Sequence, residues 1–433
     1  MSMRFRYAHI AVALLLARPG IILAQPADLS QRVSVDSLNS HVRILEDAGG
    51  YRSRVTFTPG NDSAAVSIRE MFESIPGLTG VELDTFTIPA NAPYTGRQLC
   101  NVVATLRGRT RPSDVLLLGA HYDASASRMG STTWNQHWST IWAPGADDNA
   151  TGVACLLEIA RLLSDPRSGY VCDITLKFVA FASEESGPAH QGSHGGSGHY
   201  AASARLNGEN ILGMLSIDMI GYNASHYFTS IVSDTPSIWL GDRFRAAVDS
   251  AGIQLQTNTR PYPTATYSDH ERFWAEGFSA ILLIEHAPPW TSSPVYTANP
   301  YYHTSSDTLG TLAMELVRRV TQGVLALAVS MGGGVVTGVE NDIPAPSSAE
   351  LFANYPNPFN PTTVIRFRLP EAGLVRLGVY DVLGREATVL LNGWLGPGLH
   401  TARFDGAGRA AGVYFYRLET RGSATTRAML LLN

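Results

Sequence analysis

Apolar residues alternate along most of the chain between a strand pattern and a helix pattern. Strand-like apolar runs cover residues 81–88, 101–107, 115–120, 174–182, 211–217, 227–232 and 279–284. Apolar residues at helical spacing predict helices over 33–48, 62–74, 151–164, 236–251 and 312–329. Buried strands that alternate with amphipathic helices predict an α/β domain, with a mostly parallel central sheet flanked by helices.

The pattern changes after Gly332-Gly333-Gly334. Residues 335–349 contain two prolines and two serines at their end and read as a linker. Beyond them, short alternating strands are separated by turns rich in Gly, Pro and Asn, and they lie at 363–369, 375–380, 400–404 and 413–419. Residues 350–433 are therefore predicted to form a small antiparallel β-sandwich.

The N-terminus has the pattern of a targeting segment. Arg4 and Arg6 precede an apolar run, and Ile22-Leu23-Ala24 resembles a small-residue cleavage site. A membrane anchor is the alternative, but Arg18-Pro19-Gly20 interrupts the run well short of the ~20 apolar residues that a span needs. We therefore predict a secretory signal peptide over residues 1–24, a main domain over 25–334 and no stable membrane span.

Composition narrows the class of protein. The 433 residues allow two or three domains of ~150 residues, and 45% hydrophobic with 16% charged residues is typical of a globular protein. A net charge of -5 gives no reason to expect nucleic-acid binding. Cys100, Cys155 and Cys172 allow at most one disulfide, and their apolar neighbours favour buried hydrophobic roles.

A turn before the predicted helix 151–164 places two acids side by side. Pro144-Gly145 leads into Ala146-Asp147-Asp148. Adjacent carboxylates repel each other unless a cation lies nearby. We interpret the turn as a cation site, in which one carboxylate binds a metal and the other turns to the backbone or solvent.

Further metal-binding side chains follow apolar strands. His121-Tyr122-Asp123 follows 115–120, Glu184-Glu185 follows 174–182, and Asp218 follows 211–217, while His303 and Asp307 lie in a late loop. Any one of them alone is more often a cap or a hydrogen-bonded loop residue. Their recurrence at strand ends, where open α/β sheets place their sites, favours metal binding. Two histidines with carboxylates suit zinc, a bridging carboxylate would allow two ions ~3.5–4 Å apart, and one acid of the Glu pair can act as general base.

These motifs, in this order and at these spacings, resemble the co-catalytic di-zinc aminopeptidase family of secreted bacterial enzymes. That family includes members of the glutamate carboxypeptidase type and is related to the glutaminyl cyclases. The resemblance covers roughly residues 28–331. It implies a zinc exopeptidase fold, two Zn2+ ions, and hydrolysis of N-terminal residues from peptides with a free N-terminus.

The resemblance also implies roles for individual residues. His121 and Asp218 would bind one zinc, Glu185 and His303 the other, and Asp148 would bridge them. Asp123 would hold the ring of His121, and Glu184 would be the general base. Tyr302 matches a tyrosine that hydrogen-bonds the tetrahedral intermediate in some members, and Asp147 would cap the following helix or fix the turn.

Two segments depart from the family or stay open. Residues 186–199 carry three histidines and many glycines where relatives have a short turn, and we expect a flexible loop there without an extra metal site. Trp134, Trp138 and Trp142 would either wall an apolar substrate pocket or pack on the body. Residues 267–270 resemble a family segment near the pocket, with no role assigned.

The C-terminal module shows a second resemblance. It opens with Asn354-Tyr355-Pro356-Asn357-Pro358 and ends with an arginine followed by an apolar strand, 427–433. These features resemble the Ig-like C-terminal sorting domains of the type IX secretion system. That resemblance implies export by this machinery, as a secreted or surface-attached protein. An accessory binding module is the alternative.

The expected function is therefore a secreted zinc aminopeptidase. A carboxypeptidase on the same scaffold would need a basic pocket for the substrate carboxylate. A glutaminyl cyclase normally uses one zinc, and the presence of both His121 and Asp218 argues against it. A catalytically inactive surface binding protein is disfavoured because Glu184 and the ligand set are intact.

Overall fold

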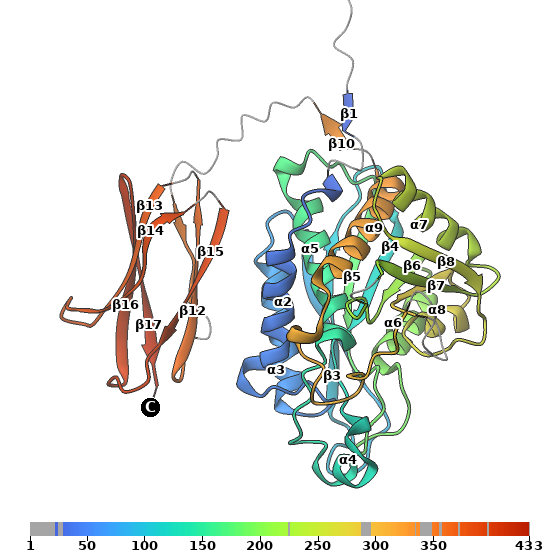
Figure 1. Cartoon of the computed structure of the whole chain (residues 1–433), viewed down its shortest axis with the longest axis horizontal. Helices are drawn as coiled ribbons and strands as arrows, with labels where there is room; N and C mark the ends of the chain where they lie inside the picture. The colour runs from blue at the N-terminus through green and yellow to red at the C-terminus, as the bar shows by residue number, and fades with distance from the viewer. Residues whose placement is uncertain are drawn as a thin grey trace, which may run out of the picture. The chain divides into compact units, whose positions relative to one another are not determined.

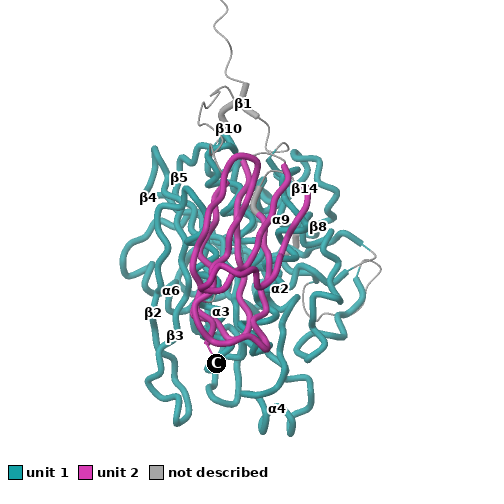
Figure 2. Tube along the Cα trace, turned by 90° about the vertical axis from the view of Figure 1, so that its left-hand side faces the viewer, with its two compact units in different colours: residues 1–339 teal, residues 340–433 magenta. Residues whose placement is uncertain are grey.

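The structure is a computed structural model of the chain, and it describes residues 22–24, 29–223, 226–286, 296–333, 335–337, 349–354, 357–370, 373–395 and 398–432. It contains two compact units, Met1–Val339 and Glu340–Asn433 (Figures 1 and 2). The boundary lies in the segment predicted as a linker, whose residues 338–348 lie outside the described part. Of the predicted signal peptide only β1 (Ile22–Ala24) is described, and it pairs antiparallel with β10 (Val335–Thr337).

A mixed eight-stranded sheet forms the centre of the first unit. Its strand order is β2-β3-β5-β4-β6-β9-β7-β8, and the four central strands β5, β4, β6 and β9 are parallel. Both edges contain antiparallel pairs, so the sheet is mixed around a parallel centre. The strands are β2 (Gly80–Thr87), β3 (Gln98–Leu106), β4 (Arg111–His121), β5 (Ile174–Phe181), β6 (Asn210–Ile217), β7 (Phe228–Ser233), β8 (Gln256–Pro261) and β9 (Ala280–Ile284).

Helices cover both faces of this sheet (Figure 1). The larger core lies on one face, where Leu116 and Leu118 of β4 pack with the helices α2 (Val35–Asp47), α3 (Pro59–Glu73), α5 (Thr151–Ser164), α7 (Ile238–Ser250) and α9 (Met314–Gly332). Val115 and Leu117, which point the other way along the same strand, pack with α6 (Gly195–Leu206) and α8 (His270–Ala275). The predicted α/β architecture with flanking helices is confirmed.

The long elements lie where the apolar pattern predicts them, within a few residues at each end. Residues typical of helix N-termini explain where two of the helices begin. Ser34 caps α2, and Thr58 with Pro59 starts α3 three residues earlier than predicted. The apolar pattern did not predict α4 (Ser131–His137), α6, α8 and β8 in the first unit, nor β11 (Glu350–Leu351) and β14 (Glu386–Leu395) in the second. The helix α6 overturns part of the flexible-loop expectation for residues 186–199, because it begins at Gly195.

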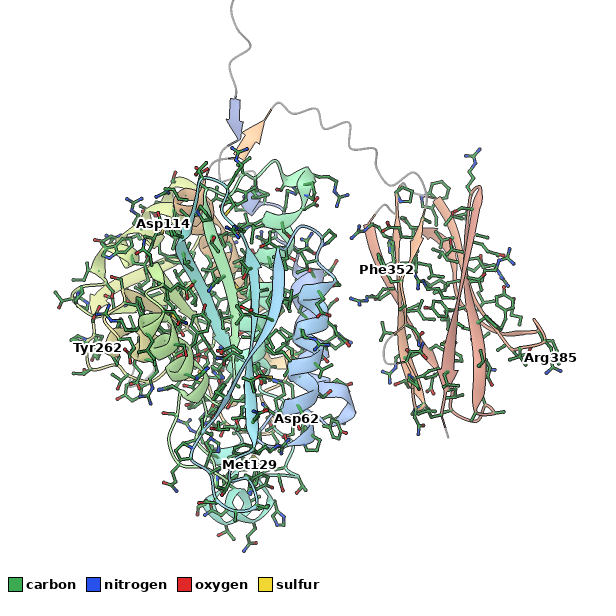
Figure 3. All side chains as sticks on the ribbon, turned by 180° about the vertical axis from the view of Figure 1, so that it is seen from behind. Asp62, Asp114, Met129, Tyr262, Phe352 and Arg385 are labelled. Carbon is green, nitrogen blue, oxygen red and sulfur yellow. The ribbon has the colours of Figure 1, made fainter. Side chains whose placement is uncertain are left out.

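The second unit consists of two antiparallel sheets, β11-β12-β15 and β14-β13-β16-β17. Their strands are β11 (Glu350–Leu351), β12 (Thr362–Leu369), β13 (Gly373–Tyr380), β14 (Glu386–Leu395), β15 (Gly398–Asp405), β16 (Gly412–Thr420) and β17 (Ser423–Leu431). Phe367, Leu377, Phe404 and Tyr416 form part of its own apolar core. Figure 3 draws the side chains of this unit and labels Phe352 and Arg385. This arrangement agrees with the predicted small β-sandwich.

Two further features limit the classes of protein. Within the described residues, the helices lack the length and apolar character that crossing a membrane requires. Cys100, Cys155 and Cys172 are all free thiols, and the last two are buried. The core therefore forms without a disulfide among these three cysteines.

Candidate active site

The candidate site lies at one edge of the sheet, where three neighbouring strands end. β4 ends at His121, β5 ends three residues before Glu184, and β6 ends directly before Asp218. Because β5, β4 and β6 are parallel neighbours, their carboxyl ends meet at the same edge. The topology therefore brings together residues that are far apart in the sequence.

One group of possible ligands contains His121, Asp148 and Asp218, all buried. The Nε2 atom of His121 lies 3.2 Å from Oδ1 of Asp148 and 3.3 Å from Oδ1 of Asp218. Two ligands of a tetrahedral zinc at ~2.0–2.2 Å would lie roughly 3.3–3.6 Å apart. The spacing of this group therefore fits one zinc ion.

A second group shares Asp148 and adds Glu185 and His303. The Nε2 atom of His303 lies 3.1 Å from Oδ2 of Asp148 and 2.5 Å from Oε1 of Glu185. The two oxygens of the Asp148 carboxylate therefore face different histidines. This is the arrangement that a bridging carboxylate between two cations requires.

The electrostatics of the site also fit a cation. Burial and the neighbouring acids Asp148 and Glu184 raise the pKa of Glu185 to about 8, against the opposing effect of His303. Burial alone would lower the pKa of His303, but Glu185 and Asp148 raise it to about 10. The raised pKa values of Glu185 and Asp218 mean that these two acids lack sufficient positive charge nearby, which a bound metal would supply, whereas, against the effect of burial, His121 and His303 lower the pKa of Asp148.

The acid turn is held by partners from elsewhere in the chain. Both oxygens of Asp307 accept hydrogen bonds from the turn, at 2.9 Å from the backbone N of Asp147 and 3.1 Å from that of Asp148. The carboxylate of Asp147 accepts from the backbone N of Gly221 at 2.7 Å and from Nδ2 of Asn299 at 3.0 Å. Of the two roles expected for Asp147, the structure therefore favours fixing the turn against neighbouring loops, since the N-cap of α5 lacks a side-chain hydrogen bond.

Arg54 joins the turn to the end of β4. Its guanidinium is fully buried and donates to the carbonyl oxygens of Tyr122 and Gly145, both at 2.7 Å. Burial lowers its pKa to about 10, while Asp307 and Asp123 act in the opposite direction. No periodic pattern in the sequence marks this residue, because its partners are backbone atoms of two distant segments.

Asp123 mainly positions the two glutamates. Its carboxylate accepts from the backbone N of Glu184 at 3.0 Å and of Glu185 at 3.1 Å, and from the hydroxyl of Thr56 at 2.9 Å. Its Oδ1 lies 3.6 Å from Nδ1 of His121, while its backbone oxygen lies closer, at 3.3 Å. The side chain therefore stands beside the His121 ring as predicted, but its hydrogen bonds go to the Glu184-Glu185 backbone. Thr56 was not identified from the sequence.

Glu184 has a partner that the sequence did not reveal. Its Oε1 lies 2.8 Å from Nε2 of His194, and Nδ1 of His194 lies 3.0 Å from Oε1 of Glu271. Burial alone would lower the pKa of His194, but Glu184 and Glu271 outweigh it and raise that pKa to about 10. His190 and His199 are also engaged, with the carbonyl oxygen of Glu185 and with Asp84. All three histidines of the segment expected to be flexible are thus held by specific contacts.

The family of the chain follows from its sequence. Residues 101–328, more than half of the chain, match the model of Peptidase family M28. The chain belongs to peptidase family M28. The matched range contains every predicted ligand and Glu184, the predicted general base.

Individual M28-like proteins resemble the chain at low identity. The uncharacterized protein YfbL of Escherichia coli (strain K12) is 28% identical over 338 residues, which cover 71% of this chain and 94% of YfbL. Among solved structures, BSAP, a zinc aminopeptidase from Bacillus subtilis, superposes with a TM-score of 0.54 at 15% identity, covering 70% of this chain and 96% of that chain. A Porphyromonas gingivalis glutaminyl cyclase gives 0.54 at 20% identity, covering 68% and 97%. At these identities the structural likeness shows the fold alone.

Left-handed backbone recurs around the candidate metal-binding positions of this M28 domain. Ser183 precedes the glutamates with φ 57°, Met219 follows Asp218 with φ 50°, and His303 itself has φ 58°. Residues other than glycine seldom adopt such angles, and they do so mostly where the surrounding fold demands it.

Tyr302 lies beside the second group of ligands. Its ring stacks on that of His303, with centroids 3.8 Å apart, and the guanidinium of Arg128 lies 4.5 Å from its ring centroid. Burial and the nearby acids, above all Glu185, raise the pKa of its phenol. The phenol therefore stays protonated and able to donate a hydrogen bond.

The aromatic residues around the site have mainly structural contacts. Trp134 is buried against Val55 and Ala143, with Trp138 packed on the same cluster. These two tryptophans therefore pack on the body, whereas Trp142 is exposed and lies under Arg52. Of the two alternatives for the tryptophans, packing on the body therefore holds for Trp134 and Trp138.

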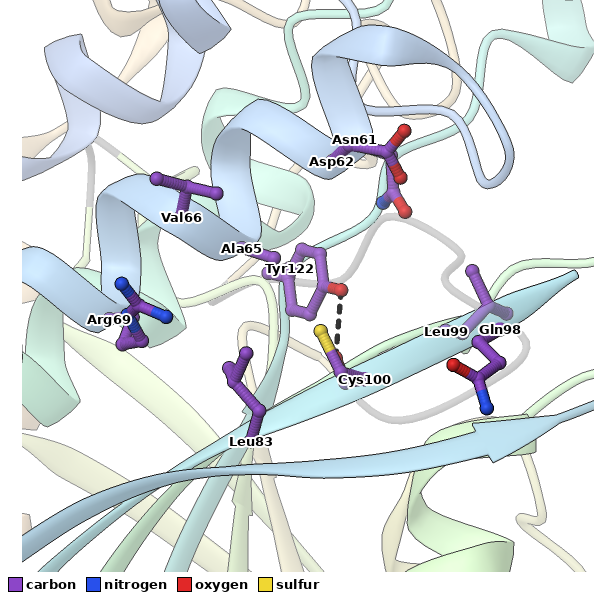
Figure 4. Close-up of a pocket in the computed structure, with 10 residues that line it drawn as sticks. All are labelled: Asn61, Asp62, Ala65, Val66, Arg69, Leu83, Gln98, Leu99, Cys100 and Tyr122. Carbon is purple, nitrogen blue, oxygen red and sulfur yellow. Dashed lines mark hydrogen bonds between the residues drawn. The ribbon is translucent and has the colours of Figure 1, made fainter. Parts of the chain in front are cut away.

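The residue between His121 and Asp123 points to the other side of β4, as strand alternation requires. Figure 4 shows the ring of Tyr122 beside Cys100, in a cavity of about 120 Å³ next to α3. Its hydroxyl donates to the carbonyl oxygen of Cys100 at 2.9 Å. Tyr122 therefore anchors the ligand-bearing strand end from behind.

Proposed function

We propose that the chain is an aminopeptidase that uses two zinc ions to release N-terminal residues from peptides. The observation that carries this proposal is the carboxylate of Asp148, whose two oxygens face His121 and His303 separately. His121 with Asp218 would hold one ion, and His303 with Glu185 the other. When bound, two such ions acidify a water molecule and polarise the scissile carbonyl.

Glu184 is the residue placed to move protons. It is 7% exposed, so it is largely shielded from bulk solvent but still reachable from the site. Asp123 holds its backbone, and His194 holds one oxygen of its carboxylate. Glu184 would accept a proton from the attacking water and pass it to the leaving amine.

The other residues would bind and orient the substrate. The protonated phenol of Tyr302 would donate a hydrogen bond to the oxygen of the tetrahedral carbon. By the resemblance to the aminopeptidases, the free α-amine of the substrate would lie at one of the metal ions or on nearby acids. That placement would restrict cleavage to the first residue.

Export is part of the proposal and rests on the sequence patterns alone. Residues 1–24 would direct the chain across the inner membrane as a signal peptide. The β-sandwich over residues 350–433 would then act as a sorting domain for the type IX secretion machinery. The enzyme would work outside the cell, secreted or attached to the surface.

A carboxypeptidase is the second candidate, and one observation favours it. Arg128 is an exposed cation stacked on Tyr302, and its backbone N donates to the carbonyl oxygen of His303 at 3.0 Å. A guanidinium beside the site is a natural partner for a substrate carboxylate. The substrate panel below therefore includes peptides with only their C-terminus free.

The test combines metal analysis with a substrate panel. The purified protein is loaded with zinc and assayed with aminoacyl anilides, free peptides and N-blocked peptides. We expect two zinc ions per chain and hydrolysis only where the N-terminus is free. Equal cleavage of N-blocked peptides would exclude an aminopeptidase, and cleavage of N-blocked peptides from the C-terminus would identify a carboxypeptidase.

A further inference from the structure

His194 contacts Glu184 through both its side chain and its backbone. Its Nε2 lies 2.8 Å from Oε1 of Glu184, and its backbone N donates to the carbonyl oxygen of Glu184 at 2.8 Å. The backbone N atoms of Gly195 and Gly196 continue this pairing with Ser183 and Ala182, at 2.7 and 2.8 Å. The start of α6 is thus tied to the strand end that carries the glutamates.

The far side of the imidazole is also held. Nδ1 lies 3.0 Å from Oε1 of Glu271, in the first turn of α8. Arg272 lies 3.3 Å from the same oxygen of Glu271 and donates to the carbonyl oxygen of Ser193 at 2.9 Å. His194 is only 4% exposed, so its ring cannot leave this position without breaking several contacts.

The backbone conformation at His194 helps to direct its ring toward Glu184. With φ 58° it lies in the left-handed region, where Asn and Gly are more at ease than His. Gly195 and Gly196 then let the helix approach closely, since a Cβ at Gly196 would lie 2.4 Å from the carbonyl oxygen of Ala182. This close approach brings the imidazole within reach of Glu184.

We propose that His194, oriented by Glu271, is a positioning residue for the proton transfer by Glu184. The imidazole donates to Oε1 of Glu184 and fixes the carboxylate rotamer. The other oxygen is then left to accept the proton of the attacking water. The proposal rests on the proposed function, since it assigns His194 a part in that reaction.

The test uses two substitutions that separate the two ring nitrogens. The amide of His194→Gln can reach the place of Nε2 and keep a donor on Glu184, whereas that of His194→Asn stays near the place of Nδ1 and faces Glu271. Asn suits the left-handed backbone better than Gln. A purely structural role would therefore favour Asn, while a role in positioning Glu184 favours Gln.

For His194→Asn we expect kcat to fall about 10–100-fold, as is typical when a residue that orients the reacting groups is lost. KM and zinc content should stay at the wild-type level, and His194→Gln should recover most of kcat. The control is His199→Gln, because His199 lies in α6 but contacts Asp84 and stacks on Phe86. A wild-type kcat in His194→Asn, or an equal loss in both variants, would overturn the proposal.

A readout independent of activity keeps this proposal separate from the proposed function. In zinc-loaded protein with ¹⁵N-labelled histidine, we expect a slowly exchanging Nε2-bound proton of His194 whose signal shifts in Glu184→Gln. If the wild type cleaves none of the substrates but this signal is present, the proposed function fails while the contact stands. If the enzyme is active but the signal does not respond to Glu184→Gln, the positioning role is refuted.

Discussion

The site contains two pairs of adjacent acids, Asp147-Asp148 and Glu184-Glu185. The pairs differ in the role of the acid that lies outside the two groups of possible ligands. In each pair one acid faces a histidine of the candidate metal site: Asp148 faces two, and Glu185 lies 2.5 Å from Nε2 of His303. Asp147 instead accepts hydrogen bonds from the backbone of Gly221 and from Asn299.

Glu184 turns to a side chain, His194, and stays beside the reacting centre. Burial and the neighbouring Asp307 raise the pKa of Asp147 well above its ordinary value, so this acid is a structural hydrogen-bonding group. Two acids that are adjacent in the sequence therefore do not by themselves determine the role of each carboxylate. The segments that pack against each pair decide which acid supports the fold and which one is free for the proton transfer proposed for Glu184.

The largest effect is expected for Asp148→Asn. An amide presents one oxygen acceptor and no negative charge, so it cannot serve both groups of ligands. We expect fewer than two zinc ions per chain by metal analysis and activity at background. Retention of two ions in this variant would show that Asp148 is not the shared ligand.

The second-largest effect on activity is expected at Glu184, the acid of the other pair that lies outside the groups of possible ligands. Glu184→Gln removes the proton acceptor, and kcat should fall about 10²–10⁴-fold, the usual contribution of general acid–base catalysis. Zinc content should remain at the wild-type level, in contrast to Asp148→Asn. Loss of zinc from this variant would make Glu184 a ligand and erase the division of roles within the pair.

Asp147→Asn should affect stability rather than turnover. The new amide can still accept from the backbone of Gly221, but its NH2 group would face the NH2 group of Asn299. One buried donor then lacks its acceptor, which costs about 1–3 kcal/mol of unfolding free energy. Denaturant unfolding measures this loss, and kcat should stay near that of the wild type. A drop in kcat as large as that of Glu184→Gln would contradict the comparison.

The smallest expected effect is a change in how the free energy of unfolding depends on pH, and it concerns Glu285, the neighbour of Asp147. Burial, together with Asp147, raises the pKa of Glu285 well above its ordinary value. An acid with a raised pKa binds more protons in the folded state than in the unfolded state. Its contribution to stability is therefore lost as the pH rises from the ordinary glutamate range toward the folded pKa.

In Glu285→Gln, the fall in unfolding free energy with rising pH should become shallower. The amide NH2 can point to Asp147, and its oxygen can still accept from the hydroxyl of Tyr296, which lies 2.8 Å from Glu285. Unfolding curves of metal-free protein at several pH values give this slope. An unchanged slope would mean that Glu285 does not hold the extra proton.

The strong apolar periods were enough to predict the long strands and helices, because burial on the sheet dictates those patterns. The sequence also pointed to the five residues that the structure gathers into the two groups of possible ligands, since each follows an apolar run or lies at a turn. The supporting residues Arg54, Thr56 and Glu271 were not, because their contacts depend on loops whose course has no periodic signal. His194 was noticed, but a segment rich in glycine looks flexible until the close packing of α6 on Ala182 and Ser183 is known.

The anchoring of the acid turn by Asp307 has a consequence for the order of assembly. The late segment that carries Asp307 also carries His303, so one stretch of chain both shapes the bridging turn and completes the second group of ligands. This stretch lies about 160 residues after the turn, a long loop that folding must close before the contacts form. During synthesis, a nascent chain that ends before this stretch can bury much of its sheet but cannot form the bridged centre. If the chain binds two metals as proposed, their stable retention would report that synthesis and folding have passed this late stretch.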